Sequence, residues 1–155
     1  MSWKDTYKVW QERTDLEPDL KQELAAMSDD KEIEDAFYGP LSFGTAGMRG
    51  LMGPGINRMN VYTVRQATEG LATLMDSLGD DIKKRGVAIG YDSRHNSRKF
   101  AHDAARVLGA HGIKVYIYDN LRPTPELSFA VRHMGTYAGI MITASHNPKE
   151  YNGYK

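Results

Sequence analysis

The sequence contains no cysteine, carries no net charge and has no long apolar segment. The absence of cysteine excludes disulfides, thiolate catalysis and zinc sites built on cysteine, and it fits a reducing compartment. Because 20 basic residues balance 20 acidic ones, no overall field directs the chain to nucleic acid or to a membrane surface. With no bilayer-length apolar run and no signal-peptide pattern, we expect a cytoplasmic protein without nucleic-acid or membrane partners.

The 155 residues are enough for one domain with a real core, and 41% hydrophobic content is ordinary for a globular protein. Residues 3–38 are expected to be helical and peripheral. Aromatic residues recur there at helical spacing, at Trp3, Tyr7 and Trp10. A Gly-Pro pair ends this stretch, and nothing in it indicates chemistry. We therefore predict an N-terminal helical extension over residues 1–40, covering one side of a domain over residues 41–155.

From residue 41 onward the sequence alternates between strand and helix patterns. Short apolar runs predict strands at 41–43, 87–91, 113–118 and 137–143. Helices are predicted at 61–78, 97–111 and 125–134. Asn60 can cap the first of these, whose buried face would carry Val64, Ala67, Leu71, Leu74, Met75 and Leu78. The alternation predicts parallel crossovers. The fold class is therefore α/β, a three-layer α/β/α domain with a mostly parallel sheet behind the helical extension.

A glycine-rich stretch follows the first predicted strand. Five glycines between residues 44 and 55 allow backbone conformations closed to other residues and let amides approach an anion. Arg49 adds a fixed positive charge. The pattern is neither a Walker P-loop nor the dinucleotide-binding glycine motif. A flexible turn would look the same, so this stretch alone is a weak signal.

The loop after the predicted strand 87–91 contains Asp92 and Arg94. Arg94 either binds a phosphate or carboxylate, or pairs with Asp92 and serves only the fold; the structural role is somewhat favoured. Ser97 can cap the helix that follows. Prolines after the next strand stiffen a loop and begin another helix.

The most informative stretch is Thr143 to Pro148, directly after a buried apolar run. Ligands of open α/β sheets lie outside the carboxyl ends of strands, so Ser145 is a candidate nucleophile. His146 is adjacent, but neighbouring side chains often point apart, and a dyad stays open. The nucleophile elbow Gly-x-Ser-x-Gly is absent, which argues against a serine hydrolase. Lys149 and Lys155 add positive charge that suits a phosphate, although a solvated loop would also contain lysines.

These motifs, in this order, resemble the first domain of the α-D-phosphohexomutases, the phosphoglucomutase and phosphomannomutase superfamily. The matching segments are 44–50, 90–94, 123–125, 143–148 and 151–155. The resemblance implies that Ser145 is phosphorylated and gives its phosphoryl group to a hexose monophosphate. The resulting bisphosphate returns its other phosphate to the serine, which interconverts glucose 1-phosphate and glucose 6-phosphate.

The resemblance also implies roles for individual residues. Arg49 and Lys155 would hold the transferring phosphoryl group, with Lys155 or His146 in proton transfer. Further phosphate-binding positions would be Thr45, Arg94, Asn147 and Lys149. Mg²⁺ would bind through the phosphate on Ser145, and glucose 1,6-bisphosphate would act as activator and intermediate.

Family enzymes have four domains, and their metal-binding loop, Asp-Gly-Asp-Gly-Asp-Arg, lies in the second. This sequence contains no such loop. We expect the remaining domains of a longer enzyme and a hexose phosphate as its partners, and we expect the 155 residues alone to be inactive. Glucose, mannose or pentose specificity stays open, as does a non-catalytic sugar-phosphate-binding or phosphoacceptor module.

Overall fold

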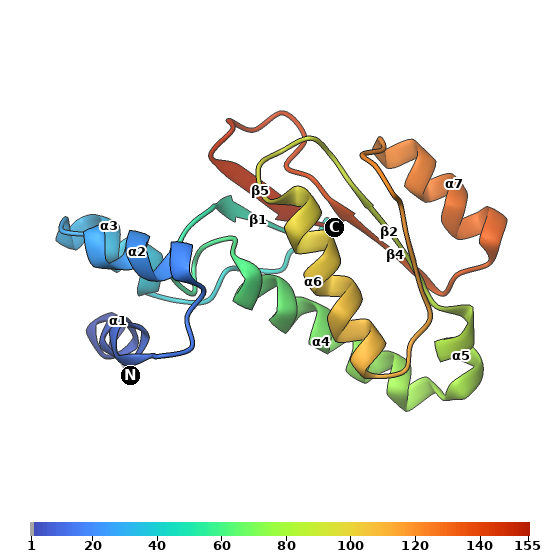
Figure 1. The fold of residues 1–155 in the computed structure, drawn as a ribbon, viewed down its shortest axis with the longest axis horizontal. Helices are drawn as coiled ribbons and strands as arrows, with labels where there is room; N and C mark the ends of the chain where they lie inside the picture. Colours follow the sequence, from blue (N-terminus) through green and yellow to red (C-terminus); the bar gives the residue numbers. More distant parts are fainter. Residues whose placement is uncertain (1) are drawn as a thin grey trace.

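The computed structural model describes residues 2–155, beginning with three helices gathered at one end of the molecule (Figure 1). These are α1 (Trp3–Glu12), α2 (Pro18–Ala26) and α3 (Asp30–Phe37). They enclose a small apolar cluster of their own, formed by Trp10, Leu16, Leu24, Ile33, Ala36 and Phe37. The rings of Tyr7 and Trp10 both meet Phe37 edge-on, at centroid distances of 5.3 and 5.6 Å. The helical character predicted for residues 3–38 is therefore observed.

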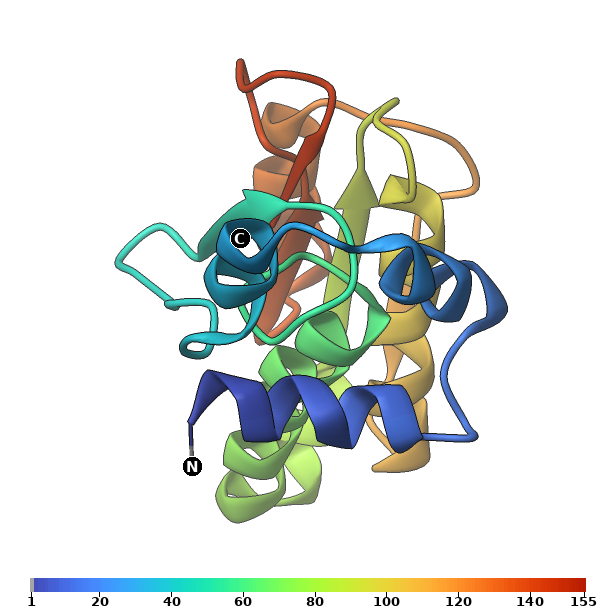
Figure 2. The same ribbon diagram turned by 90° about the vertical axis from the view of Figure 1, so that its left-hand side faces the viewer.

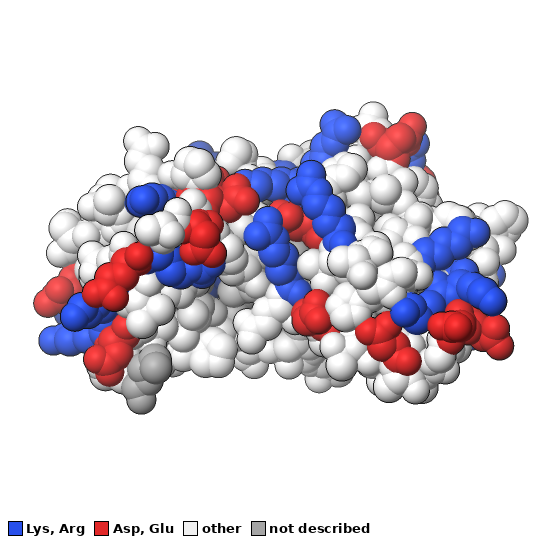
Figure 3. All heavy atoms as spheres, turned by 60° about the horizontal axis from the view of Figure 1, so that its bottom comes forward, with Lys and Arg blue, Asp and Glu red and all other residues white. Residues whose placement is uncertain are grey.

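Charged contacts also join these helices to the rest of the chain. Glu17 forms ion pairs with Arg65 at 3.5 Å and with Lys99 at 3.2 Å. Asp35 pairs with Arg58 at 2.8 Å, and the Arg58 side chain is almost fully buried. Figure 3 shows acidic and basic side chains interspersed over the end of the molecule that these helices form. The three N-terminal helices are thus held to the rest of the chain both by buried apolar side chains and by ion pairs.

The remainder of the chain forms a five-stranded sheet. Its strands are β1 (Met48–Leu51), β2 (Val87–Tyr91), β3 (Val115–Ile117), β4 (Ala138–Ile142) and β5 (Tyr151–Tyr154). Their spatial order is β1-β5-β4-β2-β3. Strands β3, β2 and β4 are parallel, as the alternating pattern predicted. Strand β5 runs antiparallel to both β4 and β1, so the sheet as a whole is mixed.

Helices cover both faces of this sheet and give the predicted three layers. Helices α4 (Val61–Leu78) and α6 (Ser97–Ala110) lie on one face, and α7 (Thr124–Met134) lies on the other (Figure 1). A short helix, α5 (Asp80–Arg85), joins α4 to β2. Alternate residues of the strands face the two layers. Ile89 and Ile140 belong to the main core with α4 and α6, whereas Ala88 and Met141 pack against α7.

Two expectations about local structure are wrong. Residues 41–43 form no strand, and the first strand lies within the glycine-rich stretch, where β1 pairs with β5. On α4, Leu74 and Leu78 are about half exposed instead of buried. The buried stripe of α4 runs through Thr68 and Ala72, because the Thr68 hydroxyl bonds back to the Val64 carbonyl and can lie in the core. The prediction assigned the buried face from the positions of apolar residues alone, and the buried face of the folded helix is slightly rotated from it.

Among residues 2–155, no helix is both long enough and apolar enough to cross a membrane.

Candidate functional site

The loops after β2 and β4 lie next to each other at one end of the sheet (Figure 2). The Asp92 amide donates to the Ile142 carbonyl at 3.1 Å, which joins the ends of the two parallel strands. The same edge receives the end of β5, because Thr143 N donates to the Gly153 carbonyl at 3.1 Å. The loops that carry Arg94 and Ser145 therefore converge at the carboxyl ends of the parallel strands.

Ser145 lies at the exposed tip of the loop after β4, in a left-handed conformation with φ of 56°. This conformation costs a non-glycine residue roughly 1–2 kcal/mol, so the surrounding loop must hold it. The Ser145 amide donates to the Thr143 hydroxyl at 3.0 Å. The Ser145 hydroxyl lies 3.3 Å from Nδ1 of His146. The two neighbouring side chains thus meet, and the serine oxygen faces solvent beside a group that can exchange a proton.

Arg94 holds this loop from behind. Its Nη2 donates to the carbonyls of Ser145 at 2.8 Å and Asn147 at 2.7 Å. Its Nη1 donates to the carbonyls of Pro148 at 2.8 Å and Tyr151 at 3.1 Å. Nε faces Asp92 at 3.5 Å, so every guanidinium donor has a partner within the chain. Of the two roles left open by the sequence, the geometry supports the structural one, because no donor is left for a phosphate.

A second set of contacts fixes the position of Arg94. Asp92 accepts from the Arg94 amide at 3.0 Å and from the Ser97 hydroxyl at 2.7 Å. Asn152, fully buried, donates to Ser97 Oγ at 3.0 Å and to the His95 carbonyl at 3.1 Å. Ser97 therefore links two loops, and the prediction that it caps α6 is wrong: Asn96 occupies the cap position and makes no side-chain capping bond.

Arg49 and Lys155 project from one face of the sheet. Arg49 lies opposite Gly153 in the β1–β5 ladder, and Lys155 is two residues further along, so the pleat directs both side chains the same way. Arg49 Nη1 donates to Asn147 Oδ1 at 2.5 Å, which places the guanidinium against the Ser145 loop. Both cationic residues are exposed. Arg49 is thus in a strand, although the sequence indicated a loop.

Two glycines make this strand pairing possible. A Cβ atom on Gly47, where φ is 100°, would lie 2.0 Å from the Tyr154 carbonyl oxygen. A Cβ atom on Gly153 would lie 2.5 Å from the Thr143 carbonyl oxygen. No side chain fits at either position, so the glycines allow β1, β5 and the serine loop to approach one another closely.

The other predicted site residues make no hydrogen bond to the Ser145 side chain. Thr45 is at the exposed tip of a turn closed by reciprocal bonds between Gly44 and Gly47. Lys149 is exposed on the serine loop itself. Within residues 2–155, neither side chain forms a hydrogen bond or ion pair. Asn147 contacts Arg49, as described above, and its backbone amide bonds to the Ala144 carbonyl at 3.1 Å.

Beneath Lys155, the side chain of Tyr154 enters the core. Burial raises the pKa of Tyr154 to about 12, although its hydrogen bond with the Thr68 hydroxyl, at 3.1 Å, acts in the opposite direction. The phenol is therefore neutral at physiological pH and serves as an anchor for β5. It takes no part in proton transfer at the surface.

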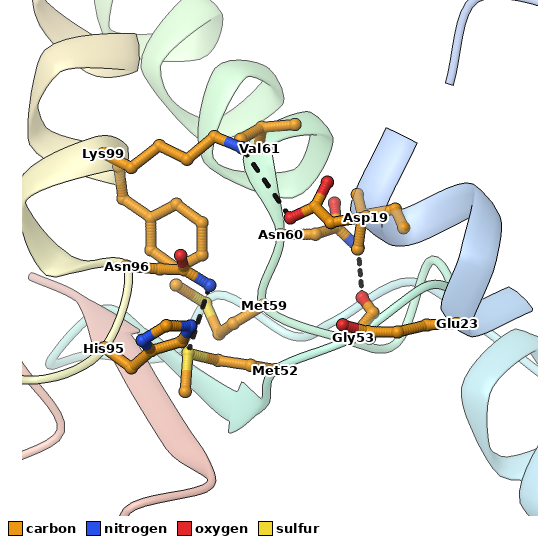
Figure 4. Close-up of a pocket in the computed structure, with 12 residues that line it drawn as sticks. Asp19, Glu23, Met52, Gly53, Met59, Asn60, Val61, His95, Asn96 and Lys99 are labelled. Atoms are coloured by element: carbon orange, nitrogen blue, oxygen red, sulfur yellow. Dashed lines mark hydrogen bonds and ion pairs between the residues drawn. The ribbon is translucent and has the colours of Figure 1, made fainter. Parts of the chain in front are cut away.

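A hollow lies elsewhere, between α2 and the start of α6 (Figure 4). Its volume is about 190 Å³, and its walls include Asp19, Glu23 and His95. Burial, and secondarily the nearby Asp19, raise the pKa of Glu23. Ser145, Arg49 and Lys155 do not line this hollow, and all three are exposed.

No group of three or more His, Asp or Glu side chains within residues 2–155 is placed to hold a metal ion. The described residues therefore provide no cluster of carboxylates or imidazoles that could bind a metal at the serine site. The exposed group that they provide there is the oxygen of Ser145.

Two supporting groups were missed in the sequence. Asn152 lies in the matching segment 151–155, but the residue pattern predicts no role for its side chain, because an Asn-Gly pair usually indicates a turn and here lies inside β5. Thr143 was noted only as part of a polar loop tip. Its hydroxyl accepts the Ser145 amide, as Thr and Ser hydroxyls often do two residues from the donor.

Comparison with known proteins gives a consistent result. Residues 40–155 match the family model described as phosphoglucomutase/phosphomannomutase, alpha/beta/alpha domain I. The chain is 41% identical over 150 residues to a phosphopentomutase of Homo sapiens, covering 93% of this chain and 24% of the relative. It is 44% identical over 148 residues to a phosphoglucomutase of Staphylococcus aureus (strain USA300), covering 96% and 26%.

A structural relative agrees with these matches. A crystal structure described as a phosphomannomutase from Thermus thermophilus superimposes with a TM-score of 0.66 and 35% sequence identity, covering 76% of this chain and 25% of the other. The chain thus spans about a quarter of the length of the relatives it matches.

Proposed function

The chain belongs to the phosphoglucomutase/phosphomannomutase family, and on that premise we propose that it is the phosphoserine domain of a glucose phosphate mutase. The parent enzyme would interconvert glucose 1-phosphate and glucose 6-phosphate. The observation that carries the proposal is the exposed, left-handed Ser145, with His146 Nδ1 at 3.3 Å and the loop carbonyls held by Arg94. This arrangement presents a hydroxyl to solvent in one fixed orientation, as a phosphoryl carrier requires.

In the proposed reaction, a hydroxyl oxygen of the hexose monophosphate bonds to the phosphorus carried by Ser145, and the bond from phosphorus to Ser145 Oγ breaks. The hydroxyl proton leaves as the new bond forms. His146 or Lys155 would accept it. The sugar bisphosphate then reorients, and Ser145 Oγ bonds to the phosphorus of its other phosphate. The bond from that phosphorus to the sugar oxygen breaks, the oxygen takes up the proton released in the first transfer, and the isomeric monophosphate leaves while the phosphoserine is restored.

Arg49 and Lys155 support this chemistry through charge. Phosphoryl transfer depends mainly on positioning and on stabilising negative charge at the equatorial oxygens. The two cations share one face of the β1–β5 pair, and Arg49 contacts the serine loop through Asn147. Thr45 and Lys149 are exposed and would contribute further donors to the phosphate.

Mg²⁺ is proposed as the metal cofactor, with glucose 1,6-bisphosphate as activator and intermediate. When bound, Mg²⁺ would neutralise part of the negative charge on the transferring group. This chain would supply one ligand, an oxygen of the phosphate on Ser145, because residues 2–155 contain no metal-binding cluster. The other ligands would come from further domains of the parent enzyme, which are proposed partners of this domain in the cytoplasm.

A second candidate is a phosphopentomutase. The phosphopentomutase of Homo sapiens matches 93% of this chain at 41% identity, a similarity close to that of the phosphoglucomutases. The domain geometry is equally suitable for either sugar, because Ser145, Arg49 and Lys155 address the phosphoryl group. The same geometry is also compatible with a phosphomannomutase, because these residues would not contact the part of the sugar that differs.

The test is a mutase assay on the full-length product of the gene, with glucose 1-phosphate, mannose 1-phosphate and ribose 1-phosphate compared at equal concentration. We expect the highest kcat/KM for glucose 1-phosphate, and loss of activity on all three sugars in Ser145→Ala. Ser77→Ala, which removes an exposed hydroxyl on α4, is the matched control. A preference for ribose 1-phosphate would favour the second candidate, and full activity in Ser145→Ala would refute both.

The isolated 155-residue chain, assayed in parallel, is expected to give no turnover. If the full-length protein is inactive on every sugar but still binds sugar phosphates, a non-catalytic binding module becomes the better account. Turnover by the isolated chain would contradict the expectation that catalysis needs the further domains.

A further inference from the structure

A second group of basic residues lies on α6, and none of them is assigned to phosphoryl transfer. An open hollow of about 640 Å³ runs along this helix. Its lining residues are polar or basic and include no acid: Ser93, Arg94, His95, Asn96, Arg98, Lys99, His102 and Arg106. In a chain with a net charge of zero, such a lining is a local excess of positive charge.

The basic groups of this hollow differ in how far they are neutralised. Lys99 is paired with Glu17 and Asp19 at 3.2 and 3.8 Å. The donors of Arg94 are used by the serine loop, as described above. Within residues 2–155, the side chains of Arg98 and His102 have no hydrogen-bond or ion-pair partner. They are the available donors of the hollow.

Arg106 is only weakly compensated. Its partner Asp103 lies 3.6 Å away, and the Arg106 side chain is 78% exposed. The same Asp103 oxygen already accepts two bonds from Arg65, at 2.8 and 3.2 Å. The negative charge of Asp103 is therefore used mainly inside the core, and Arg106 keeps its capacity for another anion.

Arg98, His102 and Arg106 form a row along one side of α6, each four residues from the next. Side chains at this spacing are neighbours on a helix surface. Given a rise of about 1.5 Å per residue, the row spans roughly 12 Å. A bound anion would accept hydrogen bonds from the free donors of Arg98 and His102.

The surroundings limit the size of that anion. Glu17 and Asp19 stand beyond Lys99, and they would repel a polyanion that extended past the row. Central parts of this face carry long Lys and Arg side chains, with acidic residues on either side (Figure 3). A compact dianion fits better than a nucleic acid. Guanidinium groups match the oxygens of a phosphate in geometry as well as in charge.

We propose that Arg98, His102 and Arg106 form a second anion site that binds the phosphate of a small phosphomonoester. The row shares none of the residues proposed for phosphoryl transfer, although the hollow that it lines also contains Arg94, which holds the Ser145 loop. Inorganic phosphate is the minimal ligand, and a sugar phosphate is the phosphomonoester that the proposed function would bring near. A sugar bisphosphate would bind more tightly still, because the row is long enough for two phosphate groups.

The test is an NMR titration of the 155-residue chain, following the backbone amides and the arginine side chains of α6. Inorganic phosphate, glucose 6-phosphate and glucose 1,6-bisphosphate are added in separate series at constant ionic strength. We expect saturable shifts at Arg98, His102 and Arg106. The double variant Arg98→Gln/Arg106→Gln should raise the dissociation constant at least tenfold, and the α6 amides of the variant should confirm that the helix is intact.

Arg132→Gln is the matched control, since it removes one exposed charge from α7, on the opposite face of the sheet. It should leave the titration unchanged. Arg49→Gln, which disables the serine site, should also leave it unchanged, so failure of this proposal and failure of the proposed function are distinguishable. Non-saturating shifts on α6, equal affinity in the double variant, or preference for a short oligonucleotide over the phosphomonoesters would each overturn the proposal.

Discussion

Replacement of Arg94 gives the sharpest prediction about how the serine loop is held. Arg94→Met keeps much of the aliphatic stem and removes four hydrogen bonds to the carbonyls of Ser145, Asn147, Pro148 and Tyr151. At about 1 kcal/mol net for each bond, the loss is bounded near 4 kcal/mol. Ser145 and Pro148 are exposed, so their carbonyls can bond to water instead. We therefore expect a loss of about 2–3 kcal/mol in the free energy of unfolding.

Arg94→Lys separates charge from geometry. An ammonium presents three donors at one point, whereas the guanidinium spreads five over a rigid plane. Lysine can therefore reach only some of the four carbonyls, and it should recover at most about half of the loss. Arg132→Met is the control, because Arg132 is exposed on α7 and, among residues 2–155, has no side-chain partner.

The assay has a global and a local part. Urea unfolding followed by circular dichroism gives the change in stability, and an unchanged slope would show that the two-state comparison is valid. Amide exchange at Asn147 and Tyr151 reports on the loop, because both amides bond to loop carbonyls, those of Ala144 and Pro148. Both should exchange faster in Arg94→Met. Unchanged stability together with unchanged exchange would refute the view that Arg94 holds the loop.

Three further predictions concern the framework around the site. Gly47→Ala and Gly153→Ala should each cost at least about 2 kcal/mol in urea unfolding, because the new Cβ would lie 2.0 or 2.5 Å from a backbone oxygen. Gly70→Ala on α4, where nothing lies within 4 Å, should instead stabilise by about 0.5–1 kcal/mol, and a loss there would contradict the reasoning. Phe37→Ala should cost about 3–5 kcal/mol in the same assay, since Phe37 is 1% exposed in the N-terminal cluster; a loss below 1 kcal/mol would mean that the cluster is not packed as described. Hydrogen bonds that the His111 ring donates to Asp76 and, secondarily, to Glu69 raise the pKa of His111. Its stabilising contribution is therefore present below the ordinary value of 6.5 and is lost as pH rises through the higher folded value. His111→Gln should therefore be less stable than wild type near about pH 6 and equal to it near about pH 9; a pH-independent difference would argue against a charged pair.

The parallel part of the fold was predictable because its periodicity is strong. Val87–Tyr91 is a continuous apolar strand, and the helices after it repeat apolar residues at helical spacing. Strands β1 and β5 were not predicted, since each has four residues and glycine or asparagine within it. Their pairing depends on contacts between residues about one hundred positions apart, which local patterns cannot reveal.

In the site, too, some features follow from local sequence patterns and others depend on contacts between distant residues. The sequence indicates Ser145 and His146 as candidates because polar residues crowd the end of a buried strand, and it indicates Arg49 through its glycine-rich surroundings. The sequence left the role of Arg94 open between phosphate binding and fold support. Only the three-dimensional arrangement resolves this, because the carbonyls that occupy its donors belong to a loop more than fifty residues away. Backbone acceptors leave no trace in side-chain composition.

The most direct test of the account is the location of phosphate on the full-length gene product after incubation with glucose 1,6-bisphosphate and Mg²⁺. Peptide mass spectrometry should place one phosphate on Ser145, and Ser145→Ala should carry none. Addition of glucose 6-phosphate should then remove the label from the wild-type protein as sugar bisphosphate forms. Phosphate on a different residue, or a Ser145 that stays unmodified while the enzyme turns over, would contradict the assignment of Ser145 as the phosphoryl carrier.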